Sequence, residues 1–153
     1  MLYPLSYEAS DHESTDVPVR VATALPRTVR EVLVIGQLSG FALECPDPAA
    51  LAAFYAEVTG APLVHSSPQW CSLELRDGLH LSFQRSADYR PPTWPDPHSS
   101  MQYHLHVRVA DLDEAEAAVL ALGATRLPAQ PSPDSARVVA DPAGHPFCLV
   151  PAR

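Results

Sequence analysis

Three ionisable side chains alternate with apolar ones along one short segment. They are His104, His106 and Arg108, separated by Leu105 and Val107. Because alternate residues of a β-strand project from the same face, all three would share one face of a strand. An imidazole suits proton transfer near neutral pH, and a guanidinium suits recognition of a carboxylate or phosphate. We predict that His104 is catalytic and that His106 and Arg108 bind a ligand; the alternative for His104 is a simple hydrogen bond to ligand or backbone.

The same alternation places polar side chains on one face of three further apolar segments. Glu44 lies in the segment 40–45, and we predict that it is the second catalytic residue. The segments 79–84 and 146–150 supply further predicted ligand-binding residues, namely His80, Ser82, Gln84 and Cys148. Two alternatives stay open. This face is simply solvated, as one face of an antiparallel sheet often is, or Glu44 pairs with Arg108 in a structural role.

These segments belong to a repeated pattern of strand and helix. In the first copy Asp47 is the predicted helix N-cap and Gly60 ends the helix, and in the second copy Asp111 and Gly123 take these places. The spacings are 111 − 47 = 64 and 123 − 60 = 63 residues, so a module has been duplicated. The predicted apolar stripes of the two helices are Leu51, Phe54, Tyr55 and Val58, and Ala115, Ala118, Val119 and Leu122.

Each predicted helix is accompanied by four short strand candidates. These are 41–45, 62–65, 70–75 and 79–84 in the first copy, and 105–109, 125–128, 136–140 and 146–150 in the second. The sequence therefore predicts an α+β fold of two βαβββ modules whose bare sheet faces enclose a half-barrel cleft for a ligand. The predicted helix-facing residues are Phe41, Leu43, Cys45, Leu79, Leu81, Phe83, Leu105, Val107, Val109, Phe147 and Leu149.

The chain divides into an extension and one domain. Residues 1–35 show little apolar periodicity, so we predict a flexible N-terminal extension. Residues 36–153 form the predicted domain, with modules 36–90 and 101–151 joined by a proline-rich loop. Trp94 lies in this loop and is predicted to contact the ligand as a lid over the cleft; the alternative is that it covers the edge of the core.

Composition argues against several classes of partner. Ten Lys and Arg against eighteen Asp and Glu give a formal net charge of -8 without a basic cluster, so nucleic-acid binding is not expected. Neither a leader pattern nor an apolar stretch approaching the roughly 20 residues that span a bilayer is present, so no membrane partner is expected. Cys45, Cys71 and Cys148 lack CxxC spacing and lie in apolar segments, which is typical of thiols in a reducing compartment. We predict a cytoplasmic protein.

Three segments carry a resemblance to a known superfamily. They are residues 45–55 (CPDPAALAAFY), 104–111 (HLHVRVAD) and 141–150 (DPAGHPFCLV). These segments resemble the vicinal oxygen chelate superfamily, which includes glyoxalase I, extradiol dioxygenases, fosfomycin-modifying enzymes and bleomycin-binding proteins. Residues 83–85 and 91–97 further resemble glyoxalase-like proteins of high-GC bacteria. The resemblance implies paired βαβββ modules, a small-molecule ligand and, frequently, a homodimer.

The resemblance also implies where a metal would bind. The corresponding positions fall on Gly40, Ser82, His104 and Cys148. Gly40 offers no donor and Ser82 is a poor one, so we predict that the usual metal site is lost and that no cofactor is needed. The alternative is a divalent iron, zinc, manganese or nickel ion that is held by His104 and His106.

Together these observations predict a glyoxalase-like small-molecule-binding protein. Its expected activity is of lyase or isomerase type on a metabolite in the cleft between the modules. One alternative is a non-catalytic protein that sequesters a drug or metabolite, as bleomycin-resistance proteins do, and another is a metal-dependent lyase or dioxygenase that uses His104 and His106. A purely structural domain would instead have a cleft well below about 300 Å³.

Overall fold

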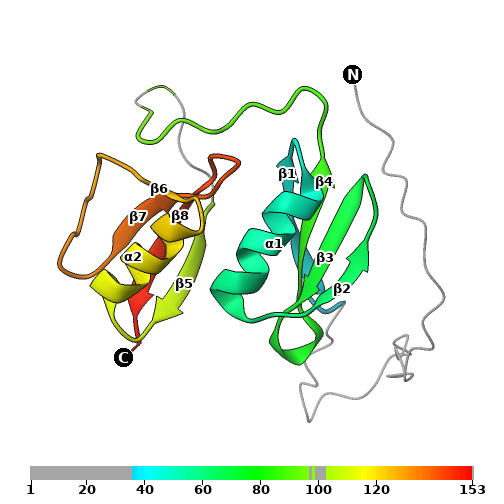
Figure 1. Cartoon of the computed structure of the whole chain (residues 1–153), viewed down its shortest axis with the longest axis horizontal. Coiled ribbons are helices and arrows are strands. Elements are labelled where there is room, and N and C mark those ends of the chain that lie inside the picture. The colour runs from blue at the N-terminus through cyan, green and yellow to red at the C-terminus, as the bar shows by residue number, and fades with distance from the viewer. Residues whose placement is uncertain (1–35, 97, 99–102, 153) are drawn as a thin grey trace, which may run out of the picture. The chain divides into compact units, whose positions relative to one another are not determined.

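The computed structural model describes residues 36–96, 98 and 103–152, which contain two consecutive βαβββ modules (Figure 1). The predicted extension, residues 1–35, lies outside the described residues. The first module consists of β1 (Gly40–Cys45), α1 (Pro48–Thr59), β2 (Leu63–Ser66), β3 (Trp70–Glu74), the short 3₁₀ turn Arg76–Gly78 and β4 (His80–Arg85). The second consists of β5 (Leu105–Val109), α2 (Leu112–Ala121), β6 (Thr125–Arg126), β7 (Arg137–Ala140) and β8 (Pro146–Pro151).

Both sheets have the same topology. The strand order is β1-β4-β3-β2 in one and β5-β8-β7-β6 in the other. In each sheet the first strand of the module lies at an edge and pairs in parallel with the last strand, while the remaining pairs are antiparallel. The register places Glu44 beside Gln84 and His106 beside Cys148. The predicted α+β class with two βαβββ modules is therefore confirmed, and each first strand presents its polar residues next to those of the last strand.

Both helices begin at the predicted aspartates. The Asp47 carboxylate accepts hydrogen bonds from the backbone amides of Ala49 and Ala50 at 3.1 Å, and the Asp111 carboxylate accepts from Asp113 and Glu114 at 2.9 Å. These bonds satisfy amides that have no partner inside a helix. The same aspartate N-cap therefore begins the helix in both modules, directly after the first strand.

The buried core follows the predicted alternation of the strands. The residues that face the helix and are buried include Leu43, Cys45, Leu81, Phe83, Phe147 and Leu149. Phe41 departs from the prediction, because it is 43% exposed. Leu43 and Cys45 lie deeper along the same strand, so the apolar face of β1 is covered only over its second half.

The apolar stripe of α2 is shorter than predicted. Val119 is buried and Ala115 packs at the edge of the core, but Ala118 is exposed and Leu122 is 42% exposed. The helix ends at Ala121, so Leu122 lies beyond the helical face that the stripe requires. Ion pairs supplement this small apolar contact, since Arg137 of β7 lies 2.8 Å from Asp113 and 3.2 Å from Glu116 on α2.

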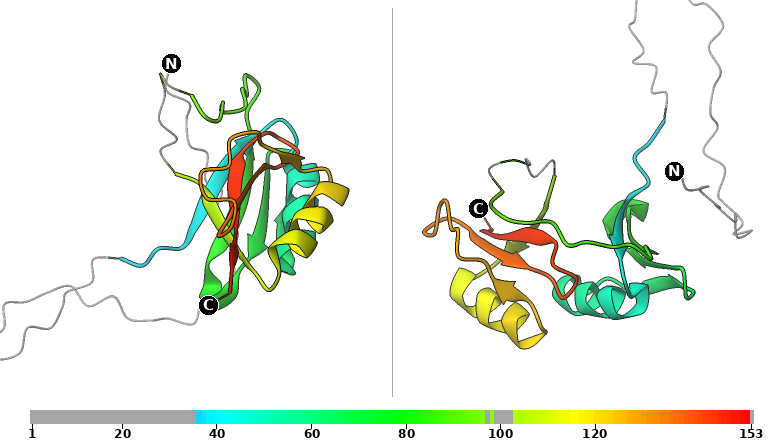
Figure 2. Two further views of the ribbon diagram at one scale, coloured as in Figure 1. Left: turned by 90° about the vertical axis from the view of Figure 1, so that its left-hand side faces the viewer. Right: turned by 90° about the horizontal axis from the view of Figure 1, so that it is seen from above.

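Aromatic side chains join the two modules into one core. Both helices lie on the same side of the strands (Figure 2). Phe147 of β8 lies edge-on to Phe54 of α1, with ring centroids 6.1 Å apart, and 6.0 Å from the ring of Tyr55. Tyr55 also stacks on Phe83 of β4 at 5.5 Å. The burial of these rings ties α1 to the second module.

Candidate functional site

A cavity of about 510 Å³ lies where the two modules meet. Its walls come from β1, the end of β4, the linker, the start of β5 and the turn before β8. The lining residues are Ala42, Leu43, Glu44, Tyr55, Gln84, Tyr89, Pro92, Tyr103, His104, Leu105, His145 and Pro146. This volume lies within the range of about 300–1,000 Å³ that is usual for small-molecule sites. The cleft is therefore larger than a purely structural domain would have.

A second hollow of about 630 Å³ lies at the far end of the first module. It is lined by the end of α1 and the segment 74–79, and its ionisable residues are Glu74 and Arg76. It contains no histidine or tyrosine and does not involve the second module. Volume alone therefore does not identify the site, and the convergence of polar side chains favours the cavity between the modules.

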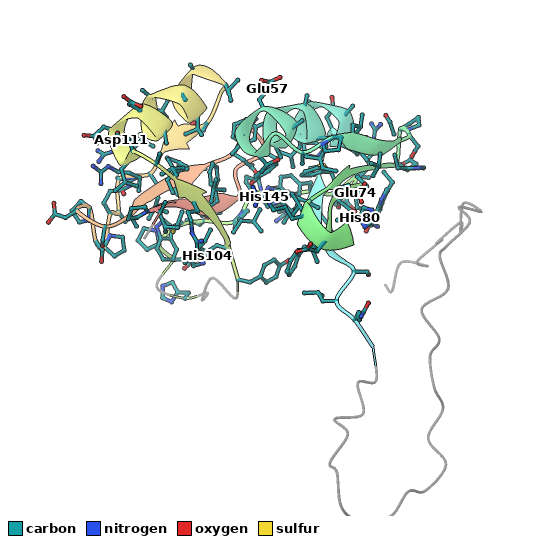
Figure 3. The ribbon with its side chains drawn as sticks, turned by 90° about the horizontal axis from the view of Figure 1, so that it is seen from below. Glu57, Glu74, His80, His104, Asp111 and His145 are labelled. Carbon is teal, nitrogen blue, oxygen red and sulfur yellow. The ribbon has the colours of Figure 1, made fainter. Side chains whose placement is uncertain are left out.

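Three of the predicted site residues meet in this cavity. Glu44 of β1 and Gln84 of β4 are register partners on neighbouring strands, and His104 precedes β5 on the other wall. In Figure 3 His104 lies on the side of β5 that is turned away from α2. These three side chains line the cavity from the two modules, and the strand alternation assigned them to the sheet faces opposite to the helices.

Several other predicted residues lie outside the cavity lining, which does not include His80, Ser82, Trp94, His106, Arg108 and Cys148. His80 and His104 lie well apart on different modules (Figure 3). Ser82 is only 6% exposed, and its hydroxyl lies 2.9 Å from that of Ser72, so this hydroxyl forms a hydrogen bond within the sheet of the first module. Its predicted contact with a ligand is not supported by this position.

Of the two predicted ligand contacts Trp94 and Arg108, the first is partly buried and the second is exposed to solvent. Trp94 is partly buried, and its indole Nε1 is buried without a hydrogen-bond partner among the described residues. Arg108 is exposed on β5. No ion pair between Arg108 and Glu44 is found in the described part of the chain, so the predicted structural pairing is not formed there.

A buried carboxylate organises one wall of the cavity. Asp141 is 3% exposed, and its Oδ1 accepts hydrogen bonds from the amides of Ala143 and His145 at 2.9 Å. Its Oδ2 accepts from the Tyr55 hydroxyl at 3.0 Å and from Nδ1 of His145 at 2.9 Å. The Tyr89 hydroxyl donates to the carbonyl of Ala143 at 2.9 Å and lies 3.1 Å from Nε2 of His145. We call Tyr55, Tyr89, Asp141 and His145 the Asp141 network.

The surroundings of the Asp141 network keep both tyrosines protonated. Burial raises the pKa of Tyr55 well above its ordinary value, and the charge and hydrogen bond of Asp141 add to this effect. Burial also raises the pKa of Tyr89, with smaller contributions from Asp141, Cys45 and Glu44. Each hydroxyl therefore remains a hydrogen-bond donor at neutral pH. On the opposite wall, burial and then the neighbouring His106 lower the pKa of His104, which favours its neutral form.

Sequence reasoning missed the Asp141 network. Tyr55 appeared only as part of an apolar stripe, and Asp141 and His145 only as part of a family-like segment. The available signal was the sequence Asp-Pro-Ala-Gly-His, in which an aspartate before a turn is followed by a histidine four residues later, directly before a strand. An aspartate in such a turn accepts hydrogen bonds from the following backbone amides, which is what Asp141 does.

The metal site that the resemblance implied does not fit the first module. A Cβ atom at Gly40 would lie 2.6 Å from the carbonyl oxygen of His80, so a ligand side chain cannot replace this glycine without movement of the backbone. Ser82 is buried and bonded to Ser72. In the second module, by contrast, ligand atoms of His104, His106 and Cys148 lie within 4.8 Å of one another.

The paired βαβββ modules with a cleft between them define the class of protein: the fold is that of the vicinal oxygen chelate superfamily. The family model of the glyoxalase-like domain matches residues 40–150. The chain therefore belongs to the glyoxalase-like domain family.

Solved structures share this fold at low sequence identity. A glyoxalase/bleomycin resistance protein/dioxygenase family enzyme from Burkholderia phytofirmans is 21% identical with a TM-score of 0.60, covering 77% of this chain and 100% of that one. The protein ATC0852 from Agrobacterium tumefaciens is 24% identical with a TM-score of 0.58, covering 78% and 99%. The fosfomycin resistance protein FosX from Listeria monocytogenes is 19% identical with a TM-score of 0.59, covering 78% and 96%. No curated protein sequence matched the chain.

Among the described residues no helix is both long and apolar enough to cross a membrane.

Proposed function

We propose that the cavity between the modules binds a small polar organic molecule and that the protein is a glyoxalase-like enzyme of lyase or isomerase type. The observation that carries this proposal is the convergence of Glu44, Gln84, Tyr89, His104 and His145 on one cavity of about 510 Å³. Apolar walls with a few oriented polar groups are the usual composition of a small-molecule site.

The cavity contains a group that can accept a proton and others that can hydrogen-bond to the substrate. Glu44 is a carboxylate on the exposed face of β1 and has the role of proton acceptor in this proposal. Tyr89 is a protonated hydroxyl that donates to the carbonyl of Ala143 and lies beside His145, and in this proposal it turns from that carbonyl to donate a hydrogen bond to the substrate. His104 contacts the ligand from the wall of the second module. This distribution supports acid–base chemistry without a contribution from the missing metal position in the first module.

The ligand-binding half of the proposal is tested with defined probes. Fosfomycin, 1S,2S-dihydroxypropylphosphonic acid, lactate and pyruvate are each mixed with the full chain, and binding is detected by ligand-observed NMR. We expect at least one probe to bind, and we expect Gln84→Ala and Tyr89→Phe to weaken that binding about tenfold or more, because each removes a hydrogen-bond donor from the cavity lining. Glu74→Gln, which changes a carboxylate in the other hollow, should leave it unchanged. Binding that resists the first two variants, or no binding of any probe, would contradict the proposal.

A second candidate function is sequestration of a small molecule without turnover. It is favoured by the misfit of Gly40 and Ser82 to the metal position, since that part of the usual reaction centre is absent. The two functions differ in the fate of a bound probe. NMR after prolonged incubation shows new resonances if the protein is an enzyme, whereas a probe recovered unchanged supports sequestration.

Three further predictions remain part of the proposal. We propose a cytoplasmic location, supported by the free thiols of Cys45, Cys71 and Cys148. We also propose a homodimer, which light scattering of the purified chain would test, because a monomer mass at all concentrations would contradict it. The likeness to proteins of high-GC bacteria likewise stays a prediction.

A further inference from the structure

Asp141, His145 and Tyr89 form a continuous hydrogen-bonded row that ends at the cavity. Nδ1 of His145 lies 2.9 Å from Oδ2 of Asp141, and Nε2 lies 3.1 Å from the Tyr89 hydroxyl. The Asp141 side chain is fully buried, whereas the His145 side chain is 16% exposed and lines the cavity together with Tyr89. Figure 3 shows His145 at the junction of the two modules. The row therefore leads from a buried carboxylate to the cavity.

The two contacts of the Tyr89 hydroxyl determine how many protons His145 carries in this arrangement. A hydroxyl has one hydrogen, and Tyr89 donates it to the carbonyl of Ala143 at 2.9 Å. The contact with Nε2 of His145 is then a hydrogen bond only if Nε2 carries a hydrogen. Nδ1 carries a hydrogen as well, because it faces a carboxylate oxygen that only accepts. The arrangement is therefore complete when the His145 ring is a cation paired with Asp141.

The neutral form of His145 reverses one of these hydrogen bonds. Asp141 holds the remaining proton on Nδ1, so Nε2 becomes an acceptor. Burial raises the pKa of the Tyr89 hydroxyl, so the hydroxyl keeps its hydrogen and turns it from the carbonyl of Ala143 to Nε2. In the cationic form the hydrogen can pass from Ala143 to an oxygen atom of a ligand, whereas in the neutral form His145 holds it.

The other titratable groups around this row come from several elements. Tyr55 of α1 donates to Asp141 at 3.0 Å, and it keeps its proton because burial raises its pKa. Cys45 lies close enough to Tyr89 to affect the pKa of the hydroxyl, and its own raised pKa keeps the thiol uncharged at neutral pH. The cavity lining adds three further titratable groups, from β1 and from the segment before β5: Glu44, Tyr103 and His104. Asp141 contacts the His145 ring directly and favours a positive charge on it.

We propose that Asp141, His145 and Tyr89 are a proton relay for the cavity, in which the charge of His145 decides whether Tyr89 presents a hydrogen or a lone pair to the ligand. A negatively charged ligand oxygen takes the hydrogen of Tyr89 while the proton on Nε2 moves to the Tyr89 oxygen, which leaves His145 neutral with its hydrogen on Nδ1. A solvent proton then restores Nε2, because the ring is partly exposed. The relay suits a ligand with a carbonyl or carboxylate oxygen. It rests on the proposed function, to which it adds a proton donor that complements Glu44.

NMR spectroscopy of the full, ligand-free chain tests the relay. The imidazole nitrogens of ¹⁵N-labelled protein and the tyrosine Cζ atoms of ¹³C-labelled protein are followed from about pH 5 to about pH 9, the range in which histidines change charge. His145→Gln and Tyr89→Phe identify the two sets of signals by their absence. As the pH rises, we expect Nε2 of His145 to lose its proton while Nδ1 keeps its own, whereas a free neutral imidazole carries its hydrogen mainly on Nε2. The Cζ signal of Tyr89 should shift with the same midpoint, because the hydroxyl changes its acceptor.

Matched substitutions show whether the two titrations are coupled. His145→Gln should abolish the pH-dependent shift of Tyr89, and His65→Gln, which removes an exposed histidine from β2 in the first module, should preserve it. Circular dichroism verifies that each variant is folded. The relay is overturned if Nε2 of His145 does not titrate in this range, if the neutral ring carries its hydrogen on Nε2, or if the Tyr89 signal stays constant. Since no probe is present, binding of a probe together with a constant Tyr89 signal would overturn the relay alone.

Discussion

Asp141 shows how a single residue sets the geometry of the cavity wall. A buried carboxylate is costly unless donors surround it, and Asp141 receives four hydrogen bonds from two amides, a tyrosine and a histidine. Through His145 and the carbonyl of Ala143 the same carboxylate also determines where the Tyr89 hydroxyl lies. Asp141 therefore positions Tyr89 and His145, which line the cavity, although Asp141 itself does not line it.

At the residue scale, the buried thiol of Cys45 predicts a dependence of stability on pH. Burial raises its pKa from the ordinary 9.0 to about 11, with smaller effects from Asp47, Asp141 and Cys71. Between about pH 9 and pH 11 the unfolded thiol ionises while the folded one keeps its proton, so the free energy of unfolding falls as pH rises through this window. Urea unfolding at several pH values measures the decline.

Removal of the thiol provides the control for this pH effect. In Cys45→Ala the decline from pH 9 should be shallower, although the absolute stability is lower because a buried side chain is truncated. Tyr55 and Tyr89, whose pKa values are also raised, continue to lower the stability at higher pH in both proteins. An identical decline in wild type and variant would show that Cys45 does not titrate in this way.

At the element scale, Asp47 and Asp111 cap the corresponding helices of the two duplicated modules in the same way. Each aspartate satisfies two helix amides, so Asp47→Ala and Asp111→Ala should each lower the free energy of unfolding by about 1 kcal/mol. The two caps lie on different helices, and the losses should therefore add in the double variant. Thermal or urea unfolding measures them. Asp134→Ala, at an exposed loop position, is the matched control, and a loss of the same size there would contradict the assignment.

Elements with a local signature were the ones that the sequence predicted well. The strand alternation, the caps at Asp47 and Asp111 and the stripe of α1 depend on neighbours a few residues away, and the structure confirms them. Leu122 was misplaced because the stripe of α2 continues in the sequence beyond the end of the helix at Ala121. A periodic pattern shows which residues share a face, but it does not show where tertiary packing ends an element.

The site was predictable only to the level of a sheet face. Glu44, Gln84 and His104 were placed on the open faces by alternation, and they do line the cavity. Ser82 lies on the same face, but its hydroxyl is hydrogen-bonded to that of Ser72. This contact depends on the pairing of β3 with β4. Asp141 and Tyr55 are 86 residues apart, and no local pattern predicts a bond between them.

At the scale of the whole molecule, the bond between Tyr55 and Asp141 links the modules through a buried polar contact. Tyr55→Phe keeps the ring that packs on Phe83 and Phe147 but leaves the carboxylate with one donor fewer. We expect a loss of about 1–3 kcal/mol in the free energy of unfolding, typical for a hydrogen bond to a charged group. Urea unfolding measures this loss. A variant as stable as wild type would show that solvent replaces the tyrosine hydroxyl at Asp141.

The aromatic core that spans both modules also predicts that they unfold together. Phe54 and Tyr55 of α1 pack on Phe147 of β8, so neither module keeps its full core alone. Unfolding followed by circular dichroism, and by the fluorescence of Trp70 in a Trp94→Phe variant, should therefore give coincident transitions.

The separation of Tyr55 and Asp141 along the chain also has a consequence for the order of folding. Each sheet forms from strands of its own module. The hydrogen bond between Tyr55 and Asp141 instead joins residues that are 86 positions apart, so its formation carries the larger entropic cost of loop closure. During synthesis from the N-terminus, α1 and its sheet are complete before Asp141 has been made. We therefore expect Phe54 and Tyr55 of α1 to stay without their partner Phe147 until β8 has been synthesised, and the cavity between the modules to form last.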